Sequence, residues 1–164
     1  MNVDDFRQMY LTELQELRSV EEQLVLALPR MAETAQNSQL KQAIQSHLDE
    51  TRTQRERLDK LLERHGAGFH EHQDGSMQGI IKEANRWAKM VQDSDLRDAG
   101  LIASAQRVEH YEIAVYGTLA TWSKQLGLDE DLRVLHAILE EEKRADAKLT
   151  DIAKRVVNPD AAST

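Results

Sequence analysis

The sequence contains no cysteine, and it is poor in glycine, proline and aromatic residues. Among its 164 residues there are 7 Gly and 2 Pro, and Phe, Trp and Tyr make up 4% of the chain. Without cysteine, the chain can form no disulfide framework, thiolate metal site or cysteine nucleophile, so a bound metal must be held by His, Asp or Glu. The scarcity of helix-breaking residues and the abundance of good helix formers predict an all-α protein.

Long hydrophobic runs and a surplus of positive charge are also missing. No stretch approaches 18 apolar residues, and the first residues lack the basic start and apolar run of a signal peptide. We therefore expect a cytoplasmic protein that does not engage a membrane. Lys and Arg number 21 against 29 Asp and Glu, and the net charge of −8 argues against a nucleic-acid partner. Metal cations suit such an acidic chain better.

Apolar residues recur at three- and four-residue steps in four long segments, which predicts four long helices. These are expected over residues 4–34, 38–64, 96–126 and from 129 onward, with Asp4, Ser38, Asp95 and Asp129 at their starts. Residues 66–95 form a long connection with a shorter amphipathic helix over 77–91. Two helical hairpins joined by one crossover make a ferritin-like four-helix bundle. We expect residues 1–158 to form this single domain and residues 159–164 to be a frayed tail.

Polar residues interrupt the apolar face of every predicted long helix at mid-length. The interruptions are Glu21, His47, Glu50, Gln54, Glu109, Glu112, Glu142 and Asp146. Because the helices of each hairpin run antiparallel, Glu21 comes level with Glu50, and the two glutamates of the third helix come level with the acids of the fourth. The sequence thus predicts one polar layer inside an apolar core.

Buried carboxylates that repel each other need a cation, since each ion loses several kcal/mol of hydration. Oxygen ligands with one imidazole suit a divalent first-row metal, and bundle proteins build di-metal sites from such side chains. We predict two ions, with iron expected and manganese or zinc also compatible. The predicted ligands are Glu21, His47, Glu50, Glu109, Glu112, Glu142 and Asp146. The alternative is an internal salt-bridge network, because Arg18, Arg52, Arg107 and Lys143 flank these positions.

The sequence leaves the roles of several residues open. The Glu-x-x-His motif typical of such bundles is absent from the second and fourth predicted helices. Gln54 is either a weak ligand or a hydrogen-bond partner, and Tyr116 is either a core residue or a redox neighbour of the metals. His110 is expected to hydrogen-bond a ligand or to pack between helices. In the crossover loop, His65, His70 and His72 are expected to bind metal only adventitiously.

The chain resembles the YciE/YciF family of bacterial ferritin-like proteins over nearly its whole length. The resemblance is carried by residues 19–29, 47–51, 97–114 and 140–146, and most specifically by Arg-Val-Glu-His-Tyr-Glu-Ile-Ala at 107–114. It implies a ferritin-like fold, a di-metal site, a homodimer and an association with bacterial stress responses, but no settled reaction. The chain departs from the family at Arg52, Thr53 and Gln54, where relatives often carry a histidine. It departs again at 75–79, where relatives tend to carry a cysteine.

Two functions follow as expectations. The first is a redox-active di-iron protein that oxidises iron or consumes peroxide or dioxygen, with ferroxidase-like or peroxidase-like chemistry. The second is a non-catalytic, stress-associated interaction protein whose polar layer holds a structural metal or only salt bridges. Added chelator distinguishes them in a thermal melt, because a structural metal stabilises the folded state.

Overall fold

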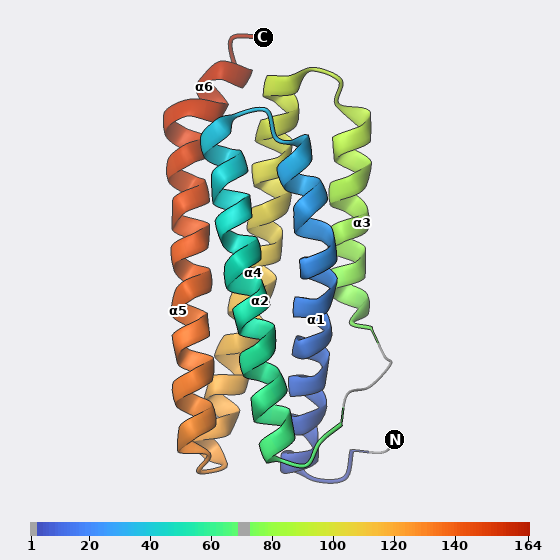
Figure 1. The fold of residues 1–164 in the computed structure, drawn as a ribbon, viewed down its shortest axis with the longest axis vertical. Coiled ribbons are helices and arrows are strands. Elements are labelled where there is room, and N and C mark those ends of the chain that lie inside the picture. The colour runs from blue at the N-terminus through green and yellow to red at the C-terminus, as the bar shows by residue number, and fades with distance from the viewer. Residues whose placement is uncertain (1–2, 69–72) are drawn as a thin grey trace.

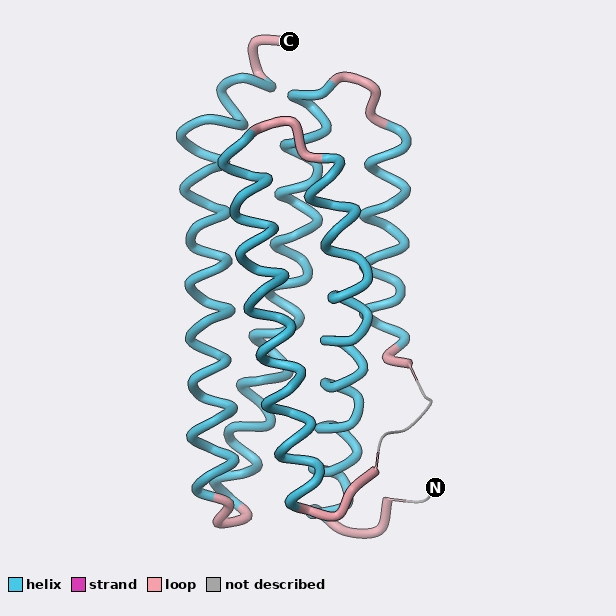
Figure 2. The backbone as a smooth tube through the Cα atoms, in the orientation of Figure 1, coloured by secondary structure: helices cyan, strands magenta, loops and turns pink. Residues whose placement is uncertain are grey.

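The computed structural model describes residues 3–68 and 73–164, and all regular structure within these ranges is helical (Figures 1 and 2). The helices are α1 (Phe6–Thr34), α2 (Ser38–Arg64), α3 (Gly75–Met90), α4 (Ser94–Gln125) and α5 (Asp129–Ile152), followed by a π-helical turn (Ala153–Val157) and α6 (Asn158–Ala161). The predicted all-α class is confirmed.

Four long helices lie side by side, and the shorter α3 runs along one flank (Figure 1). The turn between α1 and α2 and the turn between α4 and α5 are short, so each pair packs as an antiparallel hairpin. The hairpins contact each other through α2 with α5 and through α1 with α4, while α3 packs on α4 and α1. All four long helices therefore border the same interior.

Three helix starts differ from the prediction by one or two residues. The side chains that accept backbone N–H groups there are Asp5, Asn37 and Asp93, instead of the predicted Asp4, Ser38 and Asp95. Each of the three has extended backbone, which aims its side-chain oxygen at the open N–H groups of the first turn. Asp129 begins α5 as predicted, although no side chain caps that helix.

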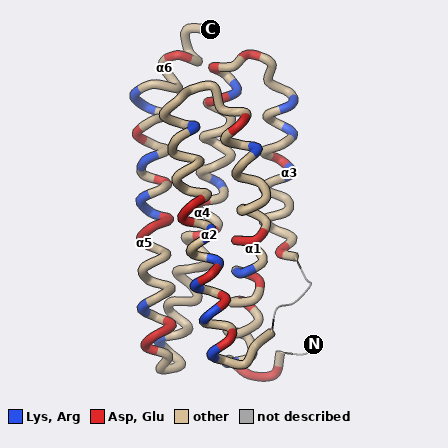
Figure 3. The backbone as a smooth tube through the Cα atoms, in the orientation of Figure 1, with Lys and Arg blue, Asp and Glu red and all other residues tan. Residues whose placement is uncertain are grey.

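The interior is built from the apolar positions that the helical periodicity predicts. Buried examples from each long helix are Leu14, Leu24, Leu40, Leu58, Leu101, Leu119, Leu135 and Leu149. Ile80 and Ile81 of α3 also pack partly against this core. Acidic and basic residues are interspersed along the long helices, with both signs visible on α2 and α5 (Figure 3). Among the described residues, no helix is both long enough and apolar enough to cross a membrane.

The C-terminal segment is more ordered than the sequence suggests. Helical backbone continues through the π-helical turn to Ala161, so the predicted frayed tail over 159–164 begins as a helix. Pro159 does not interrupt it: the proline lies at the start of α6, directly after the π-helical turn, and the Ala162 N–H donates to Asn158 O across it. The domain limit at residue 158 stays a prediction.

Candidate metal centre

Four predicted ligands from three helices meet at mid-length. His47 comes from α2, Glu109 and Glu112 from α4, and Glu142 from α5, and one nitrogen or oxygen atom from each lies within 4.8 Å of the others. All four side chains are buried. The two glutamates of α4 are three residues apart, a spacing that puts both carboxylates on one face of the helix. The group has the composition and spacing to hold a metal ion.

Glu21 of α1 adjoins this group, although it lies outside the set of four. Its side chain is completely buried, and the Tyr116 hydroxyl donates a hydrogen bond to Glu21 Oε1. The charges of Glu142 and Glu112 both interact with Glu21. With Glu21 included, every long helix contributes an acid or a histidine to the same polar region.

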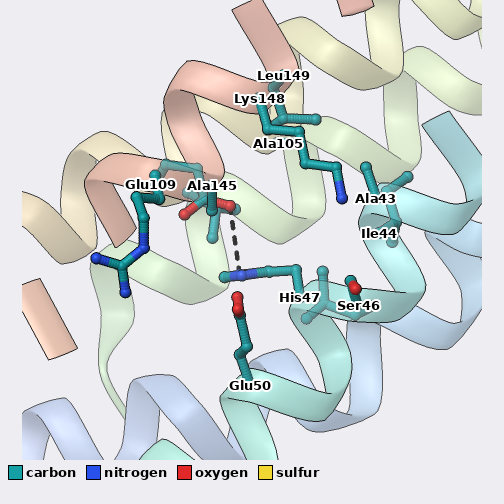
Figure 4. Close-up of a pocket in the computed structure, with 13 residues that line it drawn as sticks. Ala43, Ile44, Ser46, His47, Glu50, Ala105, Glu109, Ala145, Lys148 and Leu149 are labelled. Carbon is teal, nitrogen blue, oxygen red and sulfur yellow. Dashed lines mark ion pairs between the residues drawn. The ribbon is translucent and has the colours of Figure 1, made fainter. Parts of the chain in front are cut away.

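Glu50 and Asp146 lie farther out than the sequence predicts. Glu50 is exposed and borders a cavity together with His47 and Glu109, with its carboxylate pointing toward His47 (Figure 4). Asp146 is half-buried, and its Oδ1 lies 3.2 Å from His110 Nε2 and accepts a hydrogen bond of 3.1 Å from Gln106. Counting along antiparallel helices gives the level of a residue but not its angle around the helix axis.

Hydrogen bonds fix part of the cluster and leave the rest without partners. Gln54 donates to Glu142 Oε1 and, at 3.0 Å, to Glu141, which also pairs with Arg57. Atoms without a hydrogen bond are His47 Nδ1 and Nε2, both oxygens of Glu112, and the Oε2 atoms of Glu21, Glu109 and Glu142. His47 Nε2 lies 3.3 Å from Glu109 Oε1 without hydrogen-bond geometry. Native interiors rarely leave so many buried polar atoms unpaired, so this region fits a ligand that accepts lone pairs.

Burial dominates the electrostatics of the cluster. It raises the pKa of Glu21 to about 8 and that of Glu142 to about 7, and it holds the pKa values of Glu109 and Glu112 well above the usual range. Repulsion from Glu142 adds to the shifts of the other three. Burial also lowers the pKa of His47 to about 4. Without a cation the glutamates therefore retain protons near neutral pH, while His47 is neutral and keeps a free lone pair.

The cations that were expected to neutralise this layer are engaged elsewhere. Arg18 pairs with Glu22 and Asp59, Arg52 pairs with Asp49, and Lys143 pairs with Glu140. None of these ion pairs includes a member of the cluster. The fourth expected cation, Arg107, interacts electrostatically with Glu83 of α3. A salt-bridge layer stays an alternative to a metal.

Sequence reasoning missed two neighbours of the site and left three others unresolved. The pair Arg57 and Glu141 was not predicted, although Arg57 follows Gln54 by one turn and Glu141 precedes Glu142. Gln54 serves as a hydrogen-bond donor, and Tyr116 contacts Glu21. His110 is exposed and pairs with Asp146.

One of the three predicted loop histidines, His65, lies within the described residues and pairs with an acid. His65 Nε2 lies 2.6 Å from Asp131 Oδ2, in a buried network that also includes the Tyr10 hydroxyl and Arg64. Asp131 is thereby fully paired, so this network has no open position for a ligand. His70 and His72 lie outside the described residues.

The fold and the cluster together define an all-helical protein with a buried His/Glu group that can hold a metal ion. Residues 5–162 match the protein family described as "Domain of unknown function (DUF892)". The chain is 42% identical to Protein YciF of Escherichia coli (strain K12) over 162 residues, which are 98% of each chain. The chain belongs to this family, and the resemblance to the YciE/YciF proteins is confirmed.

Solved structures agree with this assignment. The crystal structure of the E. coli stress protein YciF matches with a TM-score of 0.91 at 41% identity, over 95% of this chain and 99% of that one. YcfI from Rhodopseudomonas palustris matches with a TM-score of 0.88 at 40% identity, over 91% and 95%. A protein of Xanthomonas campestris pv. campestris matches with a TM-score of 0.76 over 94% of each chain, but at 19% identity it shows the shared fold alone.

Proposed function

We propose that this chain is a ferritin-like four-helix bundle protein that holds two metal ions, with iron as the expected metal. The observation that carries the proposal is the set of four buried ligands, His47, Glu109, Glu112 and Glu142, whose atoms lie within 4.8 Å of one another. Several of these atoms lack any partner. Carboxylate oxygens with one imidazole also accept manganese and zinc.

The proposed ligand set contains all seven predicted residues, which differ in how close they lie to the buried group of four. His47 is neutral because burial lowers its pKa to about 4, so a lone pair is available for a metal. Glu21 and Glu50 extend the donor set from α1 and α2, and Asp146 is the outermost candidate. Tyr116 positions Glu21 and Gln54 positions Glu142 through the hydrogen bonds that they donate.

The proposed reaction is the oxidation of iron or the consumption of dioxygen or peroxide. When bound, iron at such a carboxylate site supplies redox chemistry toward small oxidants. The stress role comes from the E. coli relative, which is described as a stress protein. A homodimer and a single domain over residues 1–158 are part of the same proposal.

Anaerobic iron loading followed by oxidant tests the reaction. We expect peroxide or air to change the ferrous absorption spectrum within seconds to minutes, and we expect a Glu109→Ala variant to lose the change. An exposed-site control, His136→Ala, should behave as the parent does. An unchanged ferrous spectrum in loaded parent protein rejects the redox role.

The second candidate is a non-catalytic, stress-associated interaction protein with a structural metal or a salt-bridge layer. The linked contacts of Arg57, Glu141, Gln54 and Glu142 favour it, because they tie α2 to α5 beside the cluster and so connect the site to the packing of the helices. In this case metal would raise the melting temperature while oxidants would leave the loaded protein unchanged.

A further inference from the structure

A cavity of about 230 Å³ opens beside the metal centre, bordered mainly by α2, α4 and α5 (Figure 4). His47 and Glu109 stand at its inner end, and its walls include Ile44, Ala105 and Leu149. Small and branched apolar side chains leave this space unfilled. An apolar cavity that ends at reactive side chains has the general form of a small-molecule site.

The outer part of the cavity carries positive charge. Arg144 and Lys148 of α5 line it, and they lie four residues apart and hence on one face of the helix. Both side chains are exposed and interact electrostatically with Glu50, and Arg144 also interacts with Glu140 and Glu141. Of the acids that line the cavity, Glu50 lies across the opening on α2 and Glu109 is buried, with its pKa raised well above the usual range, so Arg144 and Lys148 supply the exposed positive charge at the opening.

We propose that this cavity binds a small amphipathic monoanion, an alkyl carboxylate, with its headgroup at Arg144 and Lys148. Its alkyl chain lies along the apolar walls and ends near His47 and Glu109. In the metal-free protein the reverse orientation would take the carboxylate out of water at the buried end of the cavity, where His47 is neutral and offers no positive charge. The inference rests on the proposed function only in making this ligand a neighbour of a metal centre.

Octanoate is the probe, measured by isothermal calorimetry on the full chain, both metal-free and metal-loaded. We expect saturable binding that is stronger than the binding of octanol. The double variant Arg144→Ala/Lys148→Ala should weaken it by at least about fivefold, since two exposed charge contacts are lost. Lys143→Ala removes a neighbouring cation that pairs with Glu140 outside the cavity, and it should leave binding unchanged.

A variant that narrows the cavity tests whether the alkyl chain of octanoate lies along the apolar walls. Ala145→Leu adds volume to the wall and should weaken octanoate binding while the melting temperature confirms that the variant is folded. Absent binding, equal binding of octanol, or full binding by the double variant overturns the inference. If the protein binds octanoate but takes up no metal, the octanoate site is supported and the metal centre is rejected. If it takes up metal but does not bind octanoate, the metal centre is supported and the octanoate site is rejected.

Discussion

Glu112 is completely buried, and neither of its carboxylate oxygens accepts a hydrogen bond. The substitution Glu112→Gln keeps the volume and removes the ionisable group. In the metal-free protein Glu112 must keep a proton that the unfolded chain has lost at pH 8, and glutamine has no such cost, so the variant should be more stable by about 1–3 kcal/mol at that pH. Metal affinity should fall at least about tenfold, because a proposed ligand is lost. Urea unfolding with chelator and calorimetric metal titration measure the two effects.

The matched control for Glu112→Gln is Glu140→Gln, which removes a carboxylate that pairs with Lys143 away from the cluster. We expect it to change neither quantity appreciably. A Glu112→Gln variant that is less stable than the parent in chelator, and that binds metal as the parent does, would contradict the assignment of Glu112.

Four of the seven predicted ligands meet in the structure, and the others show what the sequence does not determine. His47, Glu109, Glu112 and Glu142 could be predicted because each interrupts an otherwise apolar helical face, and the structure brings these four together. Glu50 lies farther out than predicted. Its rotation about the axis of α2 depends on how that helix packs, which periodicity alone does not determine. The hydrogen bond from Tyr116 to Glu21 joins residues far apart in sequence and had no local signal.

At the scale of elements, two glycines end helices where a left-handed backbone is required. Gly127, after α4, has φ of 69°, and no atom lies near the place that a Cβ would occupy. Gly127→Ala should therefore destabilise the protein by about 1–2 kcal/mol through backbone strain alone. Thermal or urea unfolding measures the change.

Gly100 lies inside α4, where the backbone is right-handed and helical, and an added Cβ would again meet open space. Gly100→Ala should stabilise the protein by about 0.5–1 kcal/mol, because alanine loses less entropy in a helix. Equal effects of the two substitutions would show that backbone conformation at Gly127 is not what ends the helix.

The elements themselves were largely predictable because apolar periodicity and glycine positions are local signals. The starts of α1, α2 and α4 shifted by one or two residues because several neighbouring Asp, Asn and Ser side chains can each cap a helix. The extension of the last helix past Pro159 was not predicted, since it depends on packing of the π-helical turn and α6 against α4.

At the scale of the whole molecule, the cluster makes stability depend on pH. The pKa values of Glu21 and Glu142 are about 8 and about 7 in the folded protein, above the ordinary glutamate value of 4.5. As pH rises through this window, the unfolded chain has already lost these protons while the folded protein retains them, so stability is lost. Burial lowers the pKa of His47 to about 4 from its ordinary value of 6.5, so near pH 6.5 the unfolded chain still binds part of a proton there, and this one group opposes the trend until about pH 7.5.

We therefore expect the melting temperature of metal-free protein to fall from pH 6.5 to pH 8. Metal affinity should rise over the same range, because metal must displace protons from the carboxylates. Scanning calorimetry at several pH values, with chelator and with added metal, measures both. A metal-free protein that gains stability toward pH 8 would contradict the raised pKa values.

Metal content per chain, measured by mass spectrometry on tag-free protein after anaerobic iron loading, decides whether the cluster is a metal site. We expect about two ions per chain in the parent and in His136→Ala, and a clear loss in His47→Ala and Glu109→Ala. Folded parent protein that takes up no metal, or variants that retain the full content, would contradict it. The cluster would then be a set of protonated carboxyl groups inside a helical protein.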